Sequence, residues 1–254
     1  MTAPPLHTLG QLAVAANRRY WTGWACAEAD PDADLTVYRS DIAHSKLNGI
    51  LRVRDQPLDA AIAEARQRLK GTPWIWWVGA DSDPGTADGL LARGARQVSD
   101  LPVMAIDVTA GADFDAPADL AIRTVTDPAE MSSYVQAYAE PMGFDSDDLT
   151  PVVERELGFA YPEVVRLAAI IDGRTVGTCT MSLGTDVGAL YCITTDPRYR
   201  RRGIASALTL EGLRLTRESG RSIATLVASS AGEPVYRRLG FETVSRYGRF
   251  TLPD

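Results

Sequence analysis

The stretch "TDPRYRRRGIASAL", Thr195–Leu208, places four arginines within five residues and then continues directly into a helical pattern. The first backbone N–H groups of a helix have no partner within the helix, and the helix dipole makes that end attractive to anions. Three interpretations are therefore open: a nucleic-acid patch, a solvated basic turn and a cradle for a phosphate group. The remainder of the sequence distinguishes between them.

The composition disfavours a broad nucleic-acid-binding surface. The 254 residues include 33 Asp and Glu against 26 Lys and Arg, which gives a formal net charge of −7. Proteins that bind nucleic acid over a whole face usually present a basic surface there. We therefore predict no nucleic-acid partner for Arg198–Arg202 and expect an anionic ligand to be met locally, by a pocket.

Several other functional classes are also disfavoured. The three cysteines, Cys26, Cys179 and Cys192, are too few and too scattered for a disulfide framework, and the two histidines show no metal-ligand spacing with cysteines or carboxylates. The N-terminus lacks the basic and apolar regions of a signal peptide, and no apolar run approaches the roughly 18 residues of a membrane span. We predict a cytoplasmic protein with no metal and no membrane partner.

The clearest boundary within the chain is the Ala-, Asp-, Gly- and Pro-rich stretch "VTAGADFDAPADL", Val108–Leu120. Such a composition is typical of a linker. It predicts a first domain at 1–108, a linker at 109–119 and a second domain at 120–254. Both halves end in the order strand, loop, short helix, glycine and strand, which favours an internal duplication.

Hydrophobic periodicity and turn residues predict the elements of each half. In the first half they predict a helix at 57–71, a strand at 73–80, a short helix ending at Gly94 and a strand at 101–108. In the second half they predict strands at 120–125, 188–195 and 222–229, helices at 127–143, 147–160, 203–219 and 233–240, a hairpin at 164–183 with its turn at Asp172-Gly173, and two closing strands.

The arginine stretch lies between the strand predicted at 188–195 and the helix predicted at 203–219. Gly203 and Ala205 leave room for an anion to approach the backbone closely, and the neighbouring arginines add positive charge. The pattern is neither a Walker loop nor a dinucleotide GxGxxG motif, because the required lysine and glycines are absent. A pyrophosphate is the ligand that this arrangement predicts.

The spacing Arg200-x-x-Gly203-x-Ala205 resembles the R/Q-x-x-G-x-G/A signature of the GNAT acetyltransferase superfamily, which binds the pyrophosphate of acetyl-CoA. The preceding "ITTDPRYR" and the later "GEPVYRRLGFE" also resemble motifs of this family, so the resemblance covers the whole second half. The first half is similar to a degenerate GNAT domain. It lacks the signature, and Leu90 stands at the place that corresponds to Tyr236.

The resemblance implies an α/β (α+β) fold with two GNAT-like domains, each a mixed, mostly antiparallel central sheet flanked by helices. It implies that the first domain binds no CoA. It implies Tyr236 as the catalytic residue that protonates or hydrogen-bonds the departing CoA thiolate, and the amide of Ile193 as the group that polarises the acetyl carbonyl. The implied cofactor-binding residues are Ile193, Thr194, Thr195, Arg200, Arg201, Arg202, Gly203, Ile204, Ala205, Ser206, Ser229 and Gly232.

The implied reaction is transfer of the acetyl group of acetyl-CoA, by direct attack, to an amine of a small molecule or peptide. Ser229 departs from the family pattern, because an asparagine often occupies this position. The general base is left open among Glu140, Asp145 and Asp254. The alternative function is a non-catalytic acyl-CoA-binding sensor or scaffold. The sequence also leaves open whether the protein is a monomer or a homodimer.

Overall fold

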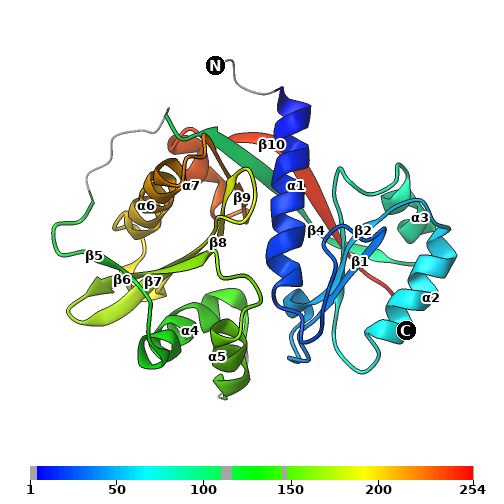
Figure 1. Ribbon diagram of the computed structural model, residues 1–254, viewed down its shortest axis with the longest axis horizontal. Coiled ribbons are helices and arrows are strands. Elements are labelled where there is room, and N and C mark those ends of the chain that lie inside the picture. Colours follow the sequence, from blue (N-terminus) through cyan, green and yellow to red (C-terminus); the bar gives the residue numbers. More distant parts are fainter. Residues whose placement is uncertain (1–4, 110–115, 145–147, 254) are drawn as a thin grey trace. The chain divides into compact units, whose positions relative to one another are not determined.

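The computed structural model describes residues 5–109, 116–144 and 148–253 and divides into two compact units (Figure 1). Unit 1 comprises Met1–Val103 together with Thr243–Asp254, and unit 2 comprises Met104–Glu242. The last residues of the chain thus group with the first half. The domains predicted from the sequence, 1–108 and 120–254 with a linker at 109–119, stay a prediction.

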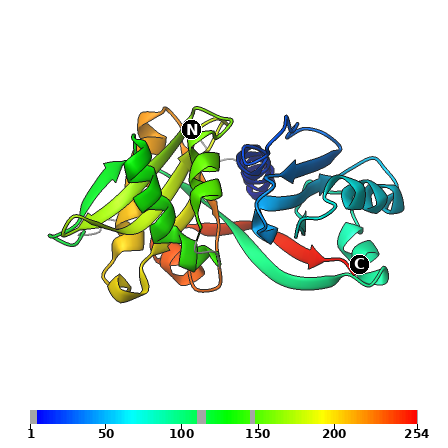
Figure 2. The same ribbon diagram turned by 90° about the horizontal axis from the view of Figure 1, so that it is seen from below.

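Unit 1 has one principal helix before its strands and two helices between them. Strand β2 pairs antiparallel with the edge strand β1 and parallel with β3, and β3 then pairs antiparallel with β10 (Figure 2). The elements are α1 (Leu6–Thr22), β1 (Leu35–Arg39), η1 (Ser45–Leu47), β2 (Asn48–Val53), α2 (Leu58–Arg68), β3 (Ile75–Val78), α3 (Thr86–Ala92), the first part of β4 (Arg96–Asp107) and most of β10 (Glu242–Thr251).

Unit 2 has strands in the order β9-β8-β7-β6-β5. Neighbouring strands are antiparallel, except that β8 and β9 are parallel. The elements are the end of β4, β5 (Ala121–Thr124), α4 (Pro128–Met142), α5 (Thr150–Leu157), β6 (Val164–Ile171), β7 (Arg174–Ser182), β8 (Gly188–Thr195), η2 (Pro197–Tyr199), α6 (Ile204–Glu218), β9 (Ile223–Val227) and α7 (Glu233–Arg238). Both α4 and α6 pack on β7 and β8.

Each unit buries its own apolar core. In unit 1, Ile50, Trp76 and Phe250 belong to one cluster and are almost fully buried. In unit 2, Leu190 on β8 and Leu208 on α6 belong to another. Burying a large apolar side chain stabilises a fold by about 1.5–3 kcal/mol, so these contacts hold the strands and helices of each unit together. The predicted mixed α/β class is confirmed.

Most predicted elements agree with the structure, and the differences have physical reasons. The hairpin turn at Asp172-Gly173 is confirmed, with φ angles of 49° and 73°. The two predicted closing strands are wrong, because residues 242–251 form the single strand β10. Helix α1 was not predicted: it begins without a side-chain cap, and polar Asn17 and Arg18 interrupt its buried face. None of the described helices has the length and apolar character needed to cross a membrane.

Candidate active site

The parallel strands β8 and β9 separate partway along β8. Their pairing covers only Gly188–Leu190 of β8, although that strand continues to Thr195. Beyond Leu190 the β9 side of β8 has no strand partner, while β7 still pairs with its other side. Backbone polar groups in such a gap need water, side chains or a ligand as partners. The end of β8 therefore offers backbone hydrogen-bonding groups to a bound molecule.

A β-bulge lies within this open part of β8. Thr178 pairs with Thr194 and Thr180 pairs with Tyr191, so two residues of β8 oppose one residue of β7. Cys192, the first of these two, has a left-handed φ of 48°. A bulge breaks the regular ladder and changes the direction of the groups beside it. Here it changes the direction of the backbone next to Ile193, which is half-buried.

Hydroxyl groups fix the bulge from β7. The buried Thr178 donates from Oγ1 to the carbonyl oxygen of Cys192 at 2.8 Å. The same Oγ1 lies 2.7 Å from Oγ1 of the buried Thr194 and accepts from it, because the single Thr178 hydroxyl proton is already donated. Oγ1 of Thr195 is buried and has no hydrogen-bond partner among the residues that the structure describes.

The loop between β8 and α6 contains two left-handed residues, Arg201 with φ 61° and Gly203 with φ 82°. Left-handed residues within a turn direct neighbouring backbone N–H groups toward a common point, which forms an anion-binding concavity. Gly203 is the N-cap residue of α6, and no side chain caps the helix. The first N–H groups of this 15-residue helix are therefore available to a ligand.

The three residues that follow differ in exposure. Ile204 is buried and its side chain belongs to the core, whereas Ala205 and Ser206 are half-buried. Ile204 can therefore contact a ligand only through its backbone, whereas Ala205 and Ser206 are also accessible through their side chains.

The four arginines of the loop have different surroundings. Arg198 forms two hydrogen bonds to Asp196, at 2.7 and 3.1 Å, which raise the pKa of the arginine and lower the pKa of the carboxyl. Arg202 forms an ion pair with Asp119 at 2.6 Å. The guanidinium groups of Arg200 and Arg201 are exposed and form no ion pair with any described residue. Two positive charges are thus available for an anion.

Tyr236 on α7 is 8% exposed, and burial raises the pKa of its phenol well above the ordinary value. Its ring makes an edge contact with Phe241, with the ring centroids 5.9 Å apart. Gly232 leaves room for this ring, because a Cβ atom at Gly232 would lie 2.9 Å from Cε2 of Tyr236. The phenol is therefore protonated near neutral pH and can act as a hydrogen-bond donor.

Ser229 has a local structural role at the start of α7. Its Oγ accepts a hydrogen bond from the backbone N–H of Gly232 at 3.1 Å, and its carbonyl oxygen accepts from Glu233 N–H at 2.9 Å. The hydroxyl is thus engaged within the chain. This turn gives a physical reason for serine at a position where the sequence analysis expected a cofactor contact.

All thirteen predicted site residues lie in unit 2: three on β8, seven in the loop and first turn of α6, and three at α7 or just before it. Helix α6 contacts β8 and α7, which brings the three groups to neighbouring elements (Figure 1).

Of the candidate bases, Glu140 is exposed on α4 and lies near enough to Arg198 to raise the pKa of that arginine. Asp145 and Asp254 lie outside the described residues.

A buried polar cluster on α4, α5 and β6 is not predicted from the sequence. Glu156 on α5 is 1% exposed; it accepts from Tyr138 at 2.9 Å and from Arg166 at 2.7 Å. The signal that could have revealed it is Arg166, a single charge within the apolar strand "VVRLAAII". The described residues contain no group of three His, Cys, Asp or Glu side chains that could hold a metal.

Comparison with known families identifies a segment that lies almost entirely in unit 2. Residues 184–244 match the model of the family described as acetyltransferase (GNAT) domain. A mycothiol acetyltransferase of Saccharomonospora viridis is 42% identical over 64 residues, which are 24% of this chain and 21% of that protein. A glucosamine 6-phosphate N-acetyltransferase of Trypanosoma brucei brucei is 30% identical over 87 residues, 32% of this chain and 59% of that protein. The chain thus matches about a fifth and about three fifths of the two relatives.

Solved structures extend the likeness in fold to the whole chain. A GCN5-related N-acetyltransferase from Kribbella flavida has a TM-score of 0.73 at 17% identity and covers 97% of both chains. A tandem GNAT protein from the clavulanic acid biosynthesis pathway has a TM-score of 0.60 at 16% identity, covering 85% of this chain and 77% of that one. At such identities the likeness concerns the fold.

Proposed function

The chain carries an acetyltransferase domain of the GNAT family within a tandem GNAT fold, and on this premise we propose that unit 2 is an acetyl-CoA-dependent N-acetyltransferase. It transfers the acetyl group to a primary amine of a small molecule or peptide. The observation that carries the proposal is the start of α6. There, two left-handed residues, an uncapped helix N-terminus and two unpaired arginines meet the open end of β8.

The loop and helix start bind the pyrophosphate in this proposal. Backbone N–H groups of residues 201–206 donate to the phosphate oxygens, and Arg200 and Arg201 contribute charge. Ala205 has no side chain beyond Cβ, so it lets the phosphates approach the backbone. Arg202, already paired with Asp119, holds the loop in place rather than acting as the main phosphate ligand.

The open part of β8 binds the acetylated arm of the substrate. The bulge directs the amide of Ile193 to the acetyl carbonyl oxygen, where it stabilises the negative charge that develops during attack. Thr194 and Thr195 continue the same strand, and their backbone groups are proposed to bind the pantetheine amides. Gly232 and Ser229 contribute the other wall, next to Tyr236.

Direct attack needs two proton movements. The amine nitrogen forms a bond to the carbonyl carbon, the C–S bond breaks with its electron pair leaving on sulfur, and the amine proton goes to water or a carboxylate. Because burial raises the pKa of Tyr236 above that of a thiol, complete proton transfer from this phenol to sulfur is unfavourable. We therefore propose that Tyr236 donates a hydrogen bond to the leaving thiolate, which takes its proton from solvent.

Calorimetric titration of acetyl-CoA into the full chain tests the cofactor site. We expect one binding site per chain and loss of binding in Ala205→Glu, with binding retained in Ala205→Gly. Unchanged affinity in Ala205→Glu would contradict the phosphate cradle. Release of CoA thiol with a panel of amines then tests catalysis, and Tyr236→Phe, which removes one hydrogen bond to the thiolate, is expected to lower turnover about tenfold. Full turnover in that variant would exclude the role of the phenol.

A non-catalytic acyl-CoA sensor is the second candidate function. The observation that favours it is the hydroxyl of Ser229, which is bonded to Gly232 N–H at 3.1 Å instead of projecting as a longer amide would. Saturable acetyl-CoA binding without thiol release for any amine in the panel would support the sensor and overturn the enzyme.

A further inference from the structure

Unit 1 contains a cavity at the place where its own parallel strands part. The pairing of β2 with β3 covers only Gly49 and Ile50, although β2 continues to Val53. A cavity of about 570 Å³ lies beyond this point, lined by α1, by the end of β2 and by the segment that follows β3. Ligand pockets commonly have volumes of about 300–1,000 Å³, so the cavity can take a small molecule.

The cavity is lined by charged side chains. Arg18, Arg52 and Arg54 line it together with the carboxylates of Asp81 and Asp83. Two of these arginines form ion pairs, Arg18 with Asp81 and Asp32 and Arg54 with Asp55, whereas Arg52 forms none with the described residues. Arg18 is neutralised locally: it bonds to the buried Asp81, and it donates from Nε to the Pro31 carbonyl at 2.8 Å.

Arg52 is the lining arginine that lacks an ion pair. Its side chain is buried, 5% exposed for the residue, and it donates only to backbone carbonyls: Asp32 and, at 2.7 and 3.2 Å, Ala33. It forms no ion pair within the described residues, and its Nη1 makes no hydrogen bond there. Burial and then the nearby Arg18 lower its pKa, and the charges of Asp81 and Asp32 offset this only in part. A buried cation that forms no ion pair is unfavourable, and a bound anion would offset this cost.

Arg54 and the apolar lining indicate the kind of anion. Arg54 lies two residues after Arg52, with its side chain 48% exposed and paired with Asp55 at 3.2 Å. Leu12 and Ala15 of α1 supply an apolar wall. We propose that this cavity binds a small monocarboxylate, with its carboxylate on Arg52 and Arg54 and its apolar part against Leu12 and Ala15. A single negative charge matches the one lining arginine that forms no ion pair with the described residues, and a planar guanidinium suits a carboxylate.

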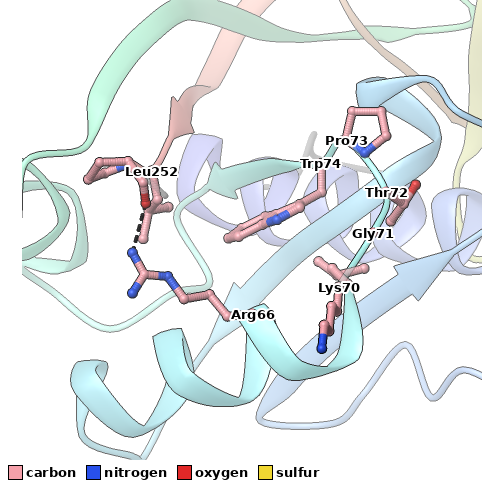
Figure 3. A pocket seen from close by; sticks show the side chains of 9 residues that line it. Arg66, Lys70, Gly71, Thr72, Pro73, Trp74 and Leu252 are labelled. Atoms are coloured by element: carbon pink, nitrogen blue, oxygen red, sulfur yellow. Dashed lines mark hydrogen bonds between the residues drawn. The ribbon is translucent and has the colours of Figure 1, made fainter.

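A second cavity of unit 1 provides the contrast (Figure 3). It has a volume of about 470 Å³ and is lined by Arg66, Lys70 and Trp74 among others. Both cations are exposed there, and Arg66 donates to the carbonyl oxygen of Pro253 at 2.7 Å. Among the described residues, no buried arginine lies beside these two solvated cations, as Arg52 does beside Arg54, so an anion gains little by binding. Arg66 therefore provides a matched control for Arg54.

Ligand-observed saturation-transfer NMR on the full chain tests the proposal, with benzoate as the probe and benzamide as its uncharged isostere. We expect benzoate to bind, benzamide to bind at least tenfold more weakly, and Arg54→Ala to weaken benzoate roughly tenfold. Arg66→Ala is expected to leave benzoate binding unchanged. Absence of benzoate binding, equal binding of benzamide, or equal weakening by both arginine variants would overturn the proposal.

Two further arms locate the probe in this cavity. Ala15→Glu places a carboxylate in the cavity and is expected to abolish benzoate binding, with the melting temperature recorded to confirm that the variant is folded. Saturating CoA is expected to leave benzoate affinity unchanged, because the proposed CoA site is in unit 2. Displacement of benzoate by CoA, or unchanged binding in a folded Ala15→Glu variant, would place the probe elsewhere and overturn the site.

Discussion

Each unit contains a pair of parallel strands connected through a helix, β2-α2-β3 in unit 1 and β8-α6-β9 in unit 2. The units differ in the connection between the first strand of the pair and the helix. Gly49 in unit 1 and Gly188 in unit 2 begin the paired segment, and in both units the pairing ends within three residues. Between β8 and α6 the chain has residues 196–203, but between β2 and α2 it has only residues 54–57. The longer connection carries Arg201 and Gly203, the two left-handed residues of the cradle.

The first turns of the two helices differ in charge as well. The second residue of α2 is Asp59, which is hydrogen-bonded to Arg93 at 2.5 and 2.8 Å, whereas the second residue of α6 is Ala205. A carboxylate in the first turn interacts favourably with the helix dipole, as a bound phosphate would. Unit 1 thus supplies its own anion at the place where unit 2 leaves space for an external one.

The largest expected effect comes from copying this feature of unit 1 into unit 2. Ala205→Asp should reduce acetyl-CoA affinity by more than about 1,000-fold, because a fixed carboxylate occupies the cradle and repels the pyrophosphate. Calorimetry measures the change, and circular dichroism checks the fold. The reciprocal Asp59→Ala should add no second site, since unit 1 lacks the longer loop. Two acetyl-CoA sites per chain in that variant would show that the loop difference is unimportant.

The next effect concerns the buried ion pair of each unit. In unit 2 both carboxylate oxygens of Glu156 are bonded, one by Tyr138 and the other by Arg166. In unit 1 Asp81 bonds to Arg18 through Oδ2, and its buried Oδ1 has no hydrogen-bond partner within the described part of the chain. The first pair is fully satisfied and the second is not.

Glu156→Gln should therefore destabilise the chain by about 3 kcal/mol, since it removes the buried carboxylate charge that faces the half-buried Arg166. Urea unfolding measures the change in the free energy of unfolding. Asp81→Asn is the matched variant and should cost less near neutral pH. An equal or larger loss in Asp81→Asn would mean that the unbonded oxygen does not distinguish the two pairs.

The sequence predicted the second unit far better than the first, for physical reasons. Strong periodicity, caps and the Asp172-Gly173 turn are local signals, and they gave nearly every element of unit 2. The arginine loop was also readable, because its chemistry is encoded in consecutive residues. Helix α1 and the bulge at Cys192 were not predicted, because tertiary packing and strand register determine them. Whether the predicted residues bind the cofactor is still a prediction.

The bulges of the two units offer a finer comparison. Strand β2 also has an irregular register, between Thr36 and Val37 of its partner, but unlike Cys192 none of its residues has a positive φ. In unit 2 the hydroxyl of Thr178 fixes the bulge. Thr178→Val should lower the affinity for acetyl-CoA relative to CoA about fivefold, because the Ile193 amide loses its direction toward the acetyl group. Thr178→Ser should restore the ratio; a ratio unchanged in the valine variant would contradict this role.

The smallest effect is a pH dependence in unit 1. Burial raises the pKa of Asp81 above its usual value, and the charge of Arg18 offsets this only in part. The folded state then holds the proton more tightly than the unfolded state, so the stability linked to Asp81 is complete below the unfolded pKa, near about 4, and is lost as pH rises through the folded pKa. The free energy of unfolding of the natural chain minus that of Asp81→Asn should therefore fall as pH rises from about 4.

Urea titrations across this range measure the difference, and Asp32→Asn, which removes an exposed carboxylate paired with the same Arg18, controls for lost charge. A difference that stays constant with pH would mean that Asp81 does not hold its proton more tightly in the folded chain, and that its unbonded oxygen is solvated in solution.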